Sequence, residues 1–161
     1  MRVLRPAVAA DAAVIVRFIQ ELAEYERLRH ECLADEASVC ATLFGAHPAA
    51  EVLLAEDDGT PVGFALFFPT YSTFLARAGM HLEDLYVTAT ARGRGVGRAL
   101  LGALARLSLA RGYGRLEWAV LDWNAPAIRF YESLGAVPLS EWTTYRVTGE
   151  ALTALAAPAS V

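Results

Sequence analysis

Three glycines alternate with arginines in the stretch Gly93-Arg94-Gly95-Val96-Gly97-Arg98, directly before a run of apolar residues at helical spacing. Glycine lets a backbone approach a ligand closely, because it has no Cβ. The first N–H groups of a helix, together with the positive end of its dipole, attract anions. We therefore predict that this stretch binds a phosphate or pyrophosphate. Mobile positive charge would come from Arg92, Arg94 and Arg98.

The same glycines have two other interpretations. One is a tight, solvated turn that binds no ligand. The other is the phosphate loop of a dinucleotide-binding fold, which should follow the first strand of a βαβ unit. The stretch instead follows the fourth predicted strand, which disfavours the dinucleotide fold. All 14 basic residues are arginine, and the lack of lysine excludes a Walker-type phosphate loop and a pyridoxal Schiff base.

The amino-acid composition excludes further classes of protein. The chain has 161 residues and is 55% hydrophobic, which predicts a single domain over residues 1–161 with its own core. A net charge of −4 offers no basic face for nucleic acid. Two cysteines without CxxC spacing and three scattered histidines predict neither a disulfide framework nor a metal site. Asp11 interrupts the apolar start, and no apolar run approaches 18 residues, so we expect no targeting segment or membrane span.

Hydrophobic periodicity predicts the elements that position the glycine stretch. We expect helices over residues 11–29, 35–44, 96–111, 124–134 and 149–157. We expect strands over residues 3–5, 51–56, 61–71, 80–87, 115–121 and 137–147. Asp57-Asp58-Gly59-Thr60 predicts a hairpin turn between the second and third strands. This order of elements indicates a mixed α/β fold built around one sheet.

Two further motifs flank the glycine stretch, and together the three resemble a known family. Leu82-Glu83-Asp84-Leu85-Tyr86-Val87 precedes Arg92-x-x-Gly95-x-Gly97, and Asn124-Ala125-Pro126-Ala127-Ile128-Arg129-Phe130-Tyr131-Glu132-Ser133-Leu134-Gly135-Ala136 follows it. This combination resembles the GNAT superfamily of acyl-CoA-dependent N-acetyltransferases over nearly the whole chain. The resemblance implies the GNAT fold, a mixed and mostly antiparallel central sheet with splayed middle strands, flanked by helices.

Within the superfamily, the chain is most similar to the diamine and thialysine acetyltransferases. The motifs that carry this similarity are Arg5-Pro6-Ala7, Glu21-Leu22-Ala23-Glu24-Tyr25-Glu26, Phe44-Gly45-Ala46-His47-Pro48, Tyr71-Ser72-Thr73 and Ala119-Val120-Leu121-Asp122-Trp123-Asn124. Several motifs in the right order are far more specific than any one of them.

The resemblance implies acetyl-CoA as the cosubstrate and no metal. Its pyrophosphate would lie on the glycine stretch, and its pantetheine arm would pair with the backbone of the strand that contains Leu85. A backbone N–H near Leu85 would polarise the thioester carbonyl. Asn124 is also suited to cap the helix that follows it. The residues implied in binding acetyl-CoA are Leu85, Tyr86, Val87, Arg92, Gly93, Arg94, Gly95, Val96, Gly97, Arg98, Asn124, Ala125, Pro126, Ala127 and Tyr131.

The resemblance also implies two catalytic residues that move protons. Glu83 would accept a proton from the substrate ammonium group through a water molecule, and Tyr131 would donate one to the departing sulfur. The residues alone show only a carboxylate in a strand and a tyrosine in a helix. Their structural alternatives are a solvated surface charge for Glu83 and packing beside Phe130 for Tyr131.

A small cationic amine is the substrate that the resemblance implies. Regular alternation along a strand would place Glu83 and Asp84 on opposite faces, unless a bulge turns both toward one cleft. Polyamine-type members have an aspartate and a tryptophan where this chain has Ser72 and Phe74, so a lysine-like or thialysine-like amine is favoured over spermidine. The residues expected near the substrate are Tyr25, Glu26, Glu83, Asp84, Glu117 and Glu141.

Two other functions remain open. Acetylation of a protein N-terminus or lysine would need an open peptide groove, which the segment 71–79 is expected to cover. A CoA-binding module without turnover would not need Glu83 or Tyr131. The leading interpretation is an N-acetyltransferase that is cytoplasmic and homodimeric, with no nucleic acid or membrane partner.

Overall fold

The computed structural model describes residues 1–157. They fall into two compact units, one spanning Met1–Leu121 and the other beginning at Asp122. The strands of the first unit are β1 (Arg2–Pro6), β2 (Glu51–Asp57), β3 (Thr60–Ser72), β4 (Arg77–Val87) and β5 (Leu116–Trp118). Its helices are η1 (Ala9–Asp11), α1 (Ala12–Tyr25), η2 (Arg29–Glu31), α2 (Glu36–Leu43), η3 (Ala89–Ala91) and α3 (Val96–Ala110). The second unit has α4 (Ala125–Glu132) and α5 (Gly149–Ala156).

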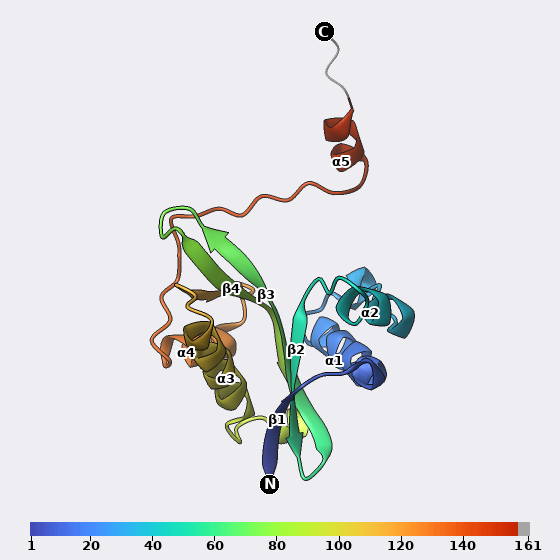
Figure 1. Cartoon of the computed structure of the whole chain (residues 1–161), viewed down its shortest axis with the longest axis vertical. Helices are drawn as coiled ribbons and strands as arrows, with labels where there is room; N and C mark the ends of the chain where they lie inside the picture. Colours follow the sequence, from blue (N-terminus) through green and yellow to red (C-terminus); the bar gives the residue numbers. More distant parts are fainter. Residues whose placement is uncertain (158–161) are drawn as a thin grey trace. The chain divides into compact units, whose positions relative to one another are not determined.

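One five-stranded sheet, in the order β1-β2-β3-β4-β5, forms the centre of the first unit. Every neighbouring pair is antiparallel except β4 and β5, which are parallel and are connected through α3. A parallel pair needs such a crossover, whereas an antiparallel pair can be joined by a short turn. Figure 1 shows α1 and α2 on one side of the sheet and α3 on the other. The expected mixed, mostly antiparallel α/β sheet flanked by helices is confirmed.

Each face of the sheet has its own apolar core. On the α1 face, Ile15 and Phe18 of the helix are fully buried in a cluster that includes Leu54 and Phe64 of the sheet. On the α3 face, Leu100 and Leu104 of the helix are fully buried, as are several sheet residues. Burying one such side chain contributes about 1.5–3 kcal/mol, so the two helices fix the sheet from both sides.

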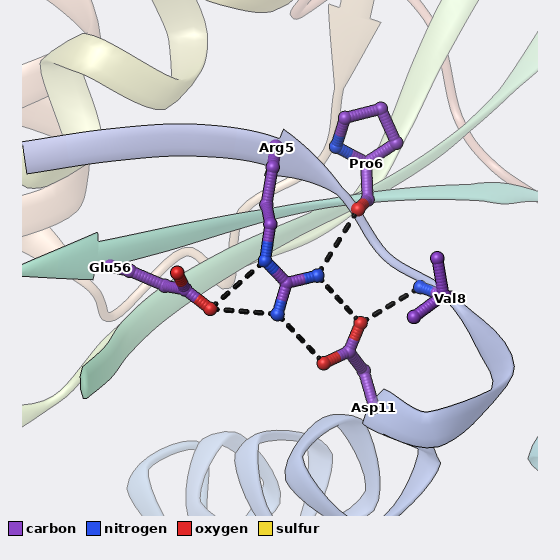
Figure 2. A network of polar contacts seen from close by, with 5 residues as sticks. All are labelled: Arg5, Pro6, Val8, Asp11 and Glu56. Carbon is purple, nitrogen blue, oxygen red and sulfur yellow. Dashed lines mark hydrogen bonds and ion pairs between the residues drawn. The ribbon is translucent and has the colours of Figure 1, made fainter. Parts of the chain in front are cut away.

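The start of α1 is attached to the sheet by an arginine with two acidic partners (Figure 2). The Arg5 guanidinium donates to both Asp11 carboxylate oxygens, at 2.7 and 2.8 Å, and to Glu56 of β2 at 2.7 and 3.0 Å. The Val8 N–H donates to Asp11 at 2.8 Å. The hydrogen bonds from Arg5 hold the pKa of Asp11 below its ordinary value. This network defines where the chain leaves β1 and enters the helix.

The hairpin between β2 and β3 forms as its sequence predicts. Asp58 and Gly59 have φ angles of 50° and 78°. Two consecutive left-handed residues are the signature of a type I′ turn, whose twist matches that of the flanking strands.

Three predicted elements have different bounds in the structure. The fourth strand begins at Arg77 rather than at Met80. The first helix ends at Tyr25 rather than near Arg29, because Arg27 adopts a left-handed φ of 63° and the Leu28 N–H bonds back to the Ala23 carbonyl at 2.8 Å. A separate 3₁₀ turn, η2, then follows. The fifth strand covers only Leu116–Trp118 instead of residues 115–121.

The strand expected over residues 137–147 is absent from the described part of the chain. A strand is stable only when its N–H and C=O groups pair with a neighbour, and Pro138 removes one donor. The apolar residues that produced the strand-like pattern are exposed, including Val137, Leu139 and Tyr145. The pattern is present in the sequence, but no described strand pairs with it.

Candidate active site

The glycine stretch forms a loop that ends at the N-terminus of α3. Gly93 and Gly95 have φ angles of 73° and 80°, which residues with a Cβ rarely adopt. A Cβ at Gly93 would meet nothing within 4 Å, and one at Gly95 would meet only the Arg2 guanidinium, at 4.0 Å. The first turn of α3 has no acidic residue, and Gly95 provides no side-chain cap. The first N–H groups of the helix thus lack a side-chain cap beside open space, and this arrangement fits an anion such as pyrophosphate.

The loop arginines are less mobile than we expected from the sequence. Arg94 pairs with Asp57 of β2 at 3.2 Å. Arg2 of β1 donates to the same carboxylate at 2.8 and 3.0 Å and to the Arg94 carbonyl at 2.9 Å. These hydrogen bonds from Arg2 lower the pKa of Asp57. The N-terminal strand therefore anchors the loop, and the anion site depends on backbone N–H groups more than on three free cations.

Arg92 turns away from the loop toward α1. Its Nε donates to the Val87 carbonyl at 3.0 Å, and its guanidinium carbon lies 4.8 Å from the centre of the Tyr25 ring and 5.8 Å from that of Tyr86. The Tyr86 hydroxyl donates to Glu21 of α1 at 2.7 Å. Burial, and then this bond, raise the pKa of Tyr86 to about 12. No local pattern in the sequence indicates these contacts, which link the end of α1 to the start of the loop.

Glu83 lies in a bulge of β4. Leu66 of β3 pairs with Asp84, but the next residue, Phe67, pairs with Leu82, so Glu83 is left without a partner on β3. Directly opposed residues share a face of the sheet, and Leu66 packs against the core on the α1 side. Asp84 therefore faces α1, as does Tyr86.

Because of the same bulge, the residues of β4 before and after Glu83 point to opposite faces of the sheet from those that regular alternation would give. Met80 faces α3, because its sulfur accepts a hydrogen bond from Ser108 of that helix at 3.4 Å. Met80 and Tyr86 are six residues apart and would share a face in a regular strand. The extra residue at Glu83 shifts this alternation. The bulge that two consecutive cleft carboxylates require is thus present in β4.

Three carboxylates affect one another at this position. Burial, reinforced by the charges of Glu83 and Glu26, raises the pKa of Asp84 to about 6. Burial also raises the pKa of Glu26, which directly follows α1. Glu83 is 56% exposed, and its carboxylate lies 3.5 Å from Nε2 of His81. Half-buried negative charge next to an apolar core is costly for the protein alone and favours a cationic ligand.

His81 is a neighbour of Glu83 that was not among the predicted site residues. Its ring lies 5.1 Å from that of Phe68 on β3, and its partner across the β4–β5 pairing is Glu117. Glu117 in turn pairs with Arg115 at 2.8 Å. Glu117 therefore lies next to the cluster formed by Glu26, Glu83 and Asp84, but it already has a cationic partner. Strand alternation alone would have placed His81 on the same face as Glu83. Only the strand pairing shows that its neighbours are Phe68 and Glu117.

The backbone around Leu85 is open on one side. β4 pairs with β5 only from Met80 to Leu82. Beyond Leu82, residues up to Val87 pair with β3 alone among the described strands. The Val87 carbonyl already accepts from Arg92. The other N–H and C=O groups that point away from β3 can pair with an extended ligand, as they would with an added strand.

The second unit carries the other predicted site residues. The Asn124 side chain is buried and accepts from the Ala127 N–H at 3.4 Å, which caps α4, and Pro126 lies in the first turn. Tyr131 lies in the last turn of α4, with its ring 5.4 Å from that of Phe130. Gly135 has a φ of 86° and ends the helical segment. Glu141 is exposed in the segment after α4.

Within residues 1–157, no group of three or more His, Cys, Asp or Glu side chains is arranged to hold a metal ion. The same residues contain no helix that is both long and apolar enough to span a bilayer.

Comparisons with known proteins identify the family of the chain. Residues 16–136 match the Acetyltransferase (GNAT) family. The L-ornithine N5-acetyltransferase of Arabidopsis thaliana is 34% identical, over 94% of this chain and 86% of that protein. The thialysine N-epsilon-acetyltransferase of Mus musculus is 37% identical, over 95% and 96%. An integron cassette protein from the mobile metagenome of V. cholerae superposes with a TM-score of 0.82 at 26% identity, over 96% and 97% of the two chains. The resemblance inferred from the sequence motifs is confirmed: the chain belongs to the acetyltransferase (GNAT) family and is an acyltransferase.

Proposed function

We propose that this protein transfers the acetyl group of acetyl-CoA to the primary amine of a small cationic molecule, directly and within a ternary complex. The observation that carries this proposal is the group formed by Glu26, Glu83 and Asp84, in which burial and mutual repulsion raise the pKa of Asp84 to about 6. Such a group favours a cation, and two of its members, Glu83 and Asp84, lie on β4, the strand that leads into the glycine loop. Acetyl-CoA supplies the activated acetyl thioester when it is bound.

Backbone groups bind and orient most of the cosubstrate in this proposal. The backbone from Gly93 to Gly97 and the N-terminus of α3 hold the pyrophosphate, with charge from Arg98. The open side of β4 at Leu85, Tyr86 and Val87 pairs with the pantetheine arm, and a backbone N–H there polarises the thioester carbonyl. The start of α4, from Asn124 to Ala127, contributes further contacts.

Two side chains handle the protons. Glu83 accepts the proton of the substrate ammonium through a water molecule and passes it to solvent, to which this side chain is 56% exposed. Tyr131 donates a proton to the departing sulfur. Tyr25, Glu26, Asp84, Glu117 and Glu141 bind and orient the cationic amine.

The preferred substrate is a lysine-like or thialysine-like amine, and ornithine and di- or polyamines are the alternatives. The relatives named for thialysine and ornithine support this class. The Ser72 hydroxyl is buried and accepts from the Leu75 N–H at 3.2 Å, so it holds the β3–β4 turn. A hydroxyl in this place provides no charge for the distant ammonium of a polyamine.

The proposal also includes the organisation of the chain. The family match crosses the boundary between the two units, which supports one functional domain over residues 1–161. Exposed apolar residues after α4, among them Val137, Leu139 and Trp142, support a homodimer that covers them. The proposal also places the protein in the cytoplasm.

A panel of primary amines with acetyl-CoA tests the proposal, with release of free thiol as the measurement. We expect thialysine, lysine and ornithine to be acetylated faster than spermidine or a peptide N-terminus. Thiol release with none of the amines would refute the enzyme assignment. Preference for the peptide would instead favour a protein acetyltransferase, and CoA binding without turnover would indicate a binding module.

The role of Glu83 is tested by Glu83→Gln across about pH 7 to 10. We expect the loss in kcat/KM to be largest at low pH and to shrink near the pKa of the amine, about 10 for a lysine-like ε-amine. Thialysine, with a less basic amine, should lose less. Equal losses for both amines at every pH would mean that Glu83 binds charge and moves no proton.

A further inference from the structure

Arg92 is an arginine of the glycine loop whose side chain contacts α1. Its guanidinium carbon lies within 6 Å of two aromatic ring centres, Tyr25 at the end of α1 and Tyr86 in β4. Distances in this range are those of favourable cation–π contacts. Its Nε is held by the Val87 carbonyl at 3.0 Å. The side chain therefore bridges the strand that enters the loop and the last turn of α1.

The end of α1 is a place where a cation from elsewhere in the chain is favourable. The C-terminus of a helix carries partial negative charge, yet α1 has no basic residue in its last turn. Glu24 adds negative charge there, while Glu21, one turn earlier, lies 3.9 Å from Arg17 of the same helix. Arg92 adds positive charge from outside the helix, next to the ring of Tyr25. A second tie, from the Tyr86 hydroxyl to Glu21 at 2.7 Å, lies about one turn earlier along the helix.

The turn held by Arg92 also positions a carboxylate. Glu26 directly follows Tyr25, and its charge contributes to raising the pKa of Asp84. Any movement of the α1 end would therefore change the distance between Glu26 and Asp84, two of the carboxylates assigned to the amine in the proposed function. Arg92 itself immediately precedes Gly93, the first left-handed residue of the anion-binding loop.

We propose that Arg92 is a positioning residue that couples the two substrates: when acetyl-CoA orders the glycine loop, Arg92 fixes the last turn of α1 and thereby the amine site. This inference rests on the proposed function. The cosubstrate and the amine then bind cooperatively, because each favours the same arrangement of Arg92 and Tyr25. In this view Arg92 does not contact the phosphates. Arg98, which is exposed and has no ion-pair or hydrogen-bond partner in residues 1–157, supplies that charge.

Substitution by lysine separates the two roles that Arg92 could have. Arg92→Lys keeps the positive charge near the loop but loses the planar group that lies over the rings and the Nε donor to Val87. A phosphate contact would largely survive this change, whereas the link to α1 would not. Arg98→Gln removes the charge proposed for the phosphates and leaves the contact between Arg92 and α1 in place. Arg106→Lys, on the exposed side of α3, is the matched control.

Hydrogen exchange with CoA as the probe gives a readout that does not depend on turnover. In the wild type we expect CoA to slow exchange both in the loop, residues 92–99, and in the α1 turn, residues 21–28. In Arg92→Lys the loop should remain protected, while the protection of the α1 turn is lost. Arg106→Lys should behave as the wild type does.

Steady-state kinetics provide the second measurement. We expect Arg92→Lys to raise the KM for the amine, measured with saturating acetyl-CoA, about fivefold to fiftyfold, the range of common coupling energies. Because coupling is reciprocal, the affinity for acetyl-CoA in the presence of saturating amine should fall by a similar factor. The Kd of the free enzyme for acetyl-CoA, measured without amine, should change by less than about threefold. Arg98→Gln should raise the KM for acetyl-CoA and leave that for the amine nearly unchanged.

The outcomes separate this inference from the proposed function. If CoA protects the loop in the wild type but not the α1 turn, or if Arg92→Lys keeps both protections, the coupling is refuted while the acetyl-CoA site stands. A rise only in the KM for acetyl-CoA would identify Arg92 as a phosphate ligand and also refute the coupling. No protection of either segment by CoA would overturn both proposals.

Discussion

Replacing Asp84 by asparagine should stabilise the protein while weakening the binding of its amine substrate. Burial and the charges of Glu83 and Glu26 raise the pKa of Asp84 from 3.8 to about 6. At about 1.4 kcal/mol per pKa unit, this is at most about 3 kcal/mol of unfavourable free energy for the ionised carboxylate in the folded state. Partial exposure screens the charge, so we expect an effect of about 1–2 kcal/mol. The asparagine side chain would remove the charge and keep a similar shape.

The sign of the effect gives a distinctive dependence on pH. The folded protein holds the Asp84 proton more tightly than the unfolded chain does. The stability of the wild type that depends on this group is therefore fully present below about pH 4, falls as the pH rises to about 6 and is constant above it. The advantage of Asp84→Asn should follow the reverse course: absent near pH 4 and complete above about pH 7.

Thermal unfolding at several pH values measures the stability effect. An increase of about 1–2 kcal/mol corresponds to roughly 2–8 °C in Tm for a chain of this length. Asp58→Asn is a suitable control, since Asp58 is an exposed turn residue whose left-handed φ of 50° asparagine tolerates. We expect no pH-dependent gain from it.

The same variant should be impaired as an enzyme. The KM of the wild type for the amine should fall as the pH rises through about 6, because Asp84 becomes ionised and attracts the cation. In Asp84→Asn this dependence should disappear, and the KM at about pH 7.5 should be about tenfold to a hundredfold higher, as expected for a lost charged hydrogen bond. An unchanged or lower Tm at about pH 7.5, or an equal gain at about pH 4.5, would refute the reasoning.

Three further predictions concern the loop, the second unit and the assembly. Gly95→Val should stay folded but lose the stabilisation by acetyl-CoA, which at about 100 times Kd is roughly 2.7 kcal/mol or 5–10 °C in Tm; an undiminished shift would contradict the pyrophosphate site. Tyr131→Phe should lower kcat about 10²–10³-fold with little change in acetyl-CoA affinity, and full activity would remove Tyr131 from the mechanism. Light scattering at micromolar concentration should give twice the 17.4 kDa of one chain, whereas a monomer would exclude the homodimer.

Local signals were enough to predict the conformation of the glycine loop and the start of the helix after it. Gly93 and Gly95 have the left-handed φ angles for which glycine is favoured, and α3 begins at Val96 as the apolar spacing indicates. The hairpin at Asp58 and Gly59 was predictable for the same reason, since turn conformation is encoded within a few residues. The mixed α/β sheet followed from the order of such elements, and the GNAT fold followed from the family resemblance that the motifs carry.

Features that depend on a partner strand or helix were not predictable from local pattern. Strand alternation shows that Glu83 and Asp84 can share a face only if β4 contains a bulge. The position of that bulge is known only from the pairing of β4 with Leu66 and Phe67. The shortened first helix depends on the left-handed Arg27, a conformation that costs an ordinary residue energy and has no clear local signal. Residues 137–147 show the opposite error: a strand-like pattern that no described strand pairs with.

The bulge explains how one strand can serve two chemically opposite faces. Met80 and Leu82 pack on the α3 side and are almost fully buried. Without the extra residue, alternation would carry this facing forward and direct Asp84 toward the apolar residues of α3, where an unpaired carboxylate is costly. With the residue inserted, Asp84 faces the half-buried region near Glu26, where its charge can be neutralised by a cationic ligand. The stability lost by burying Asp84 and the affinity that we propose for an amine therefore have a single structural cause, the position of Glu83 in β4.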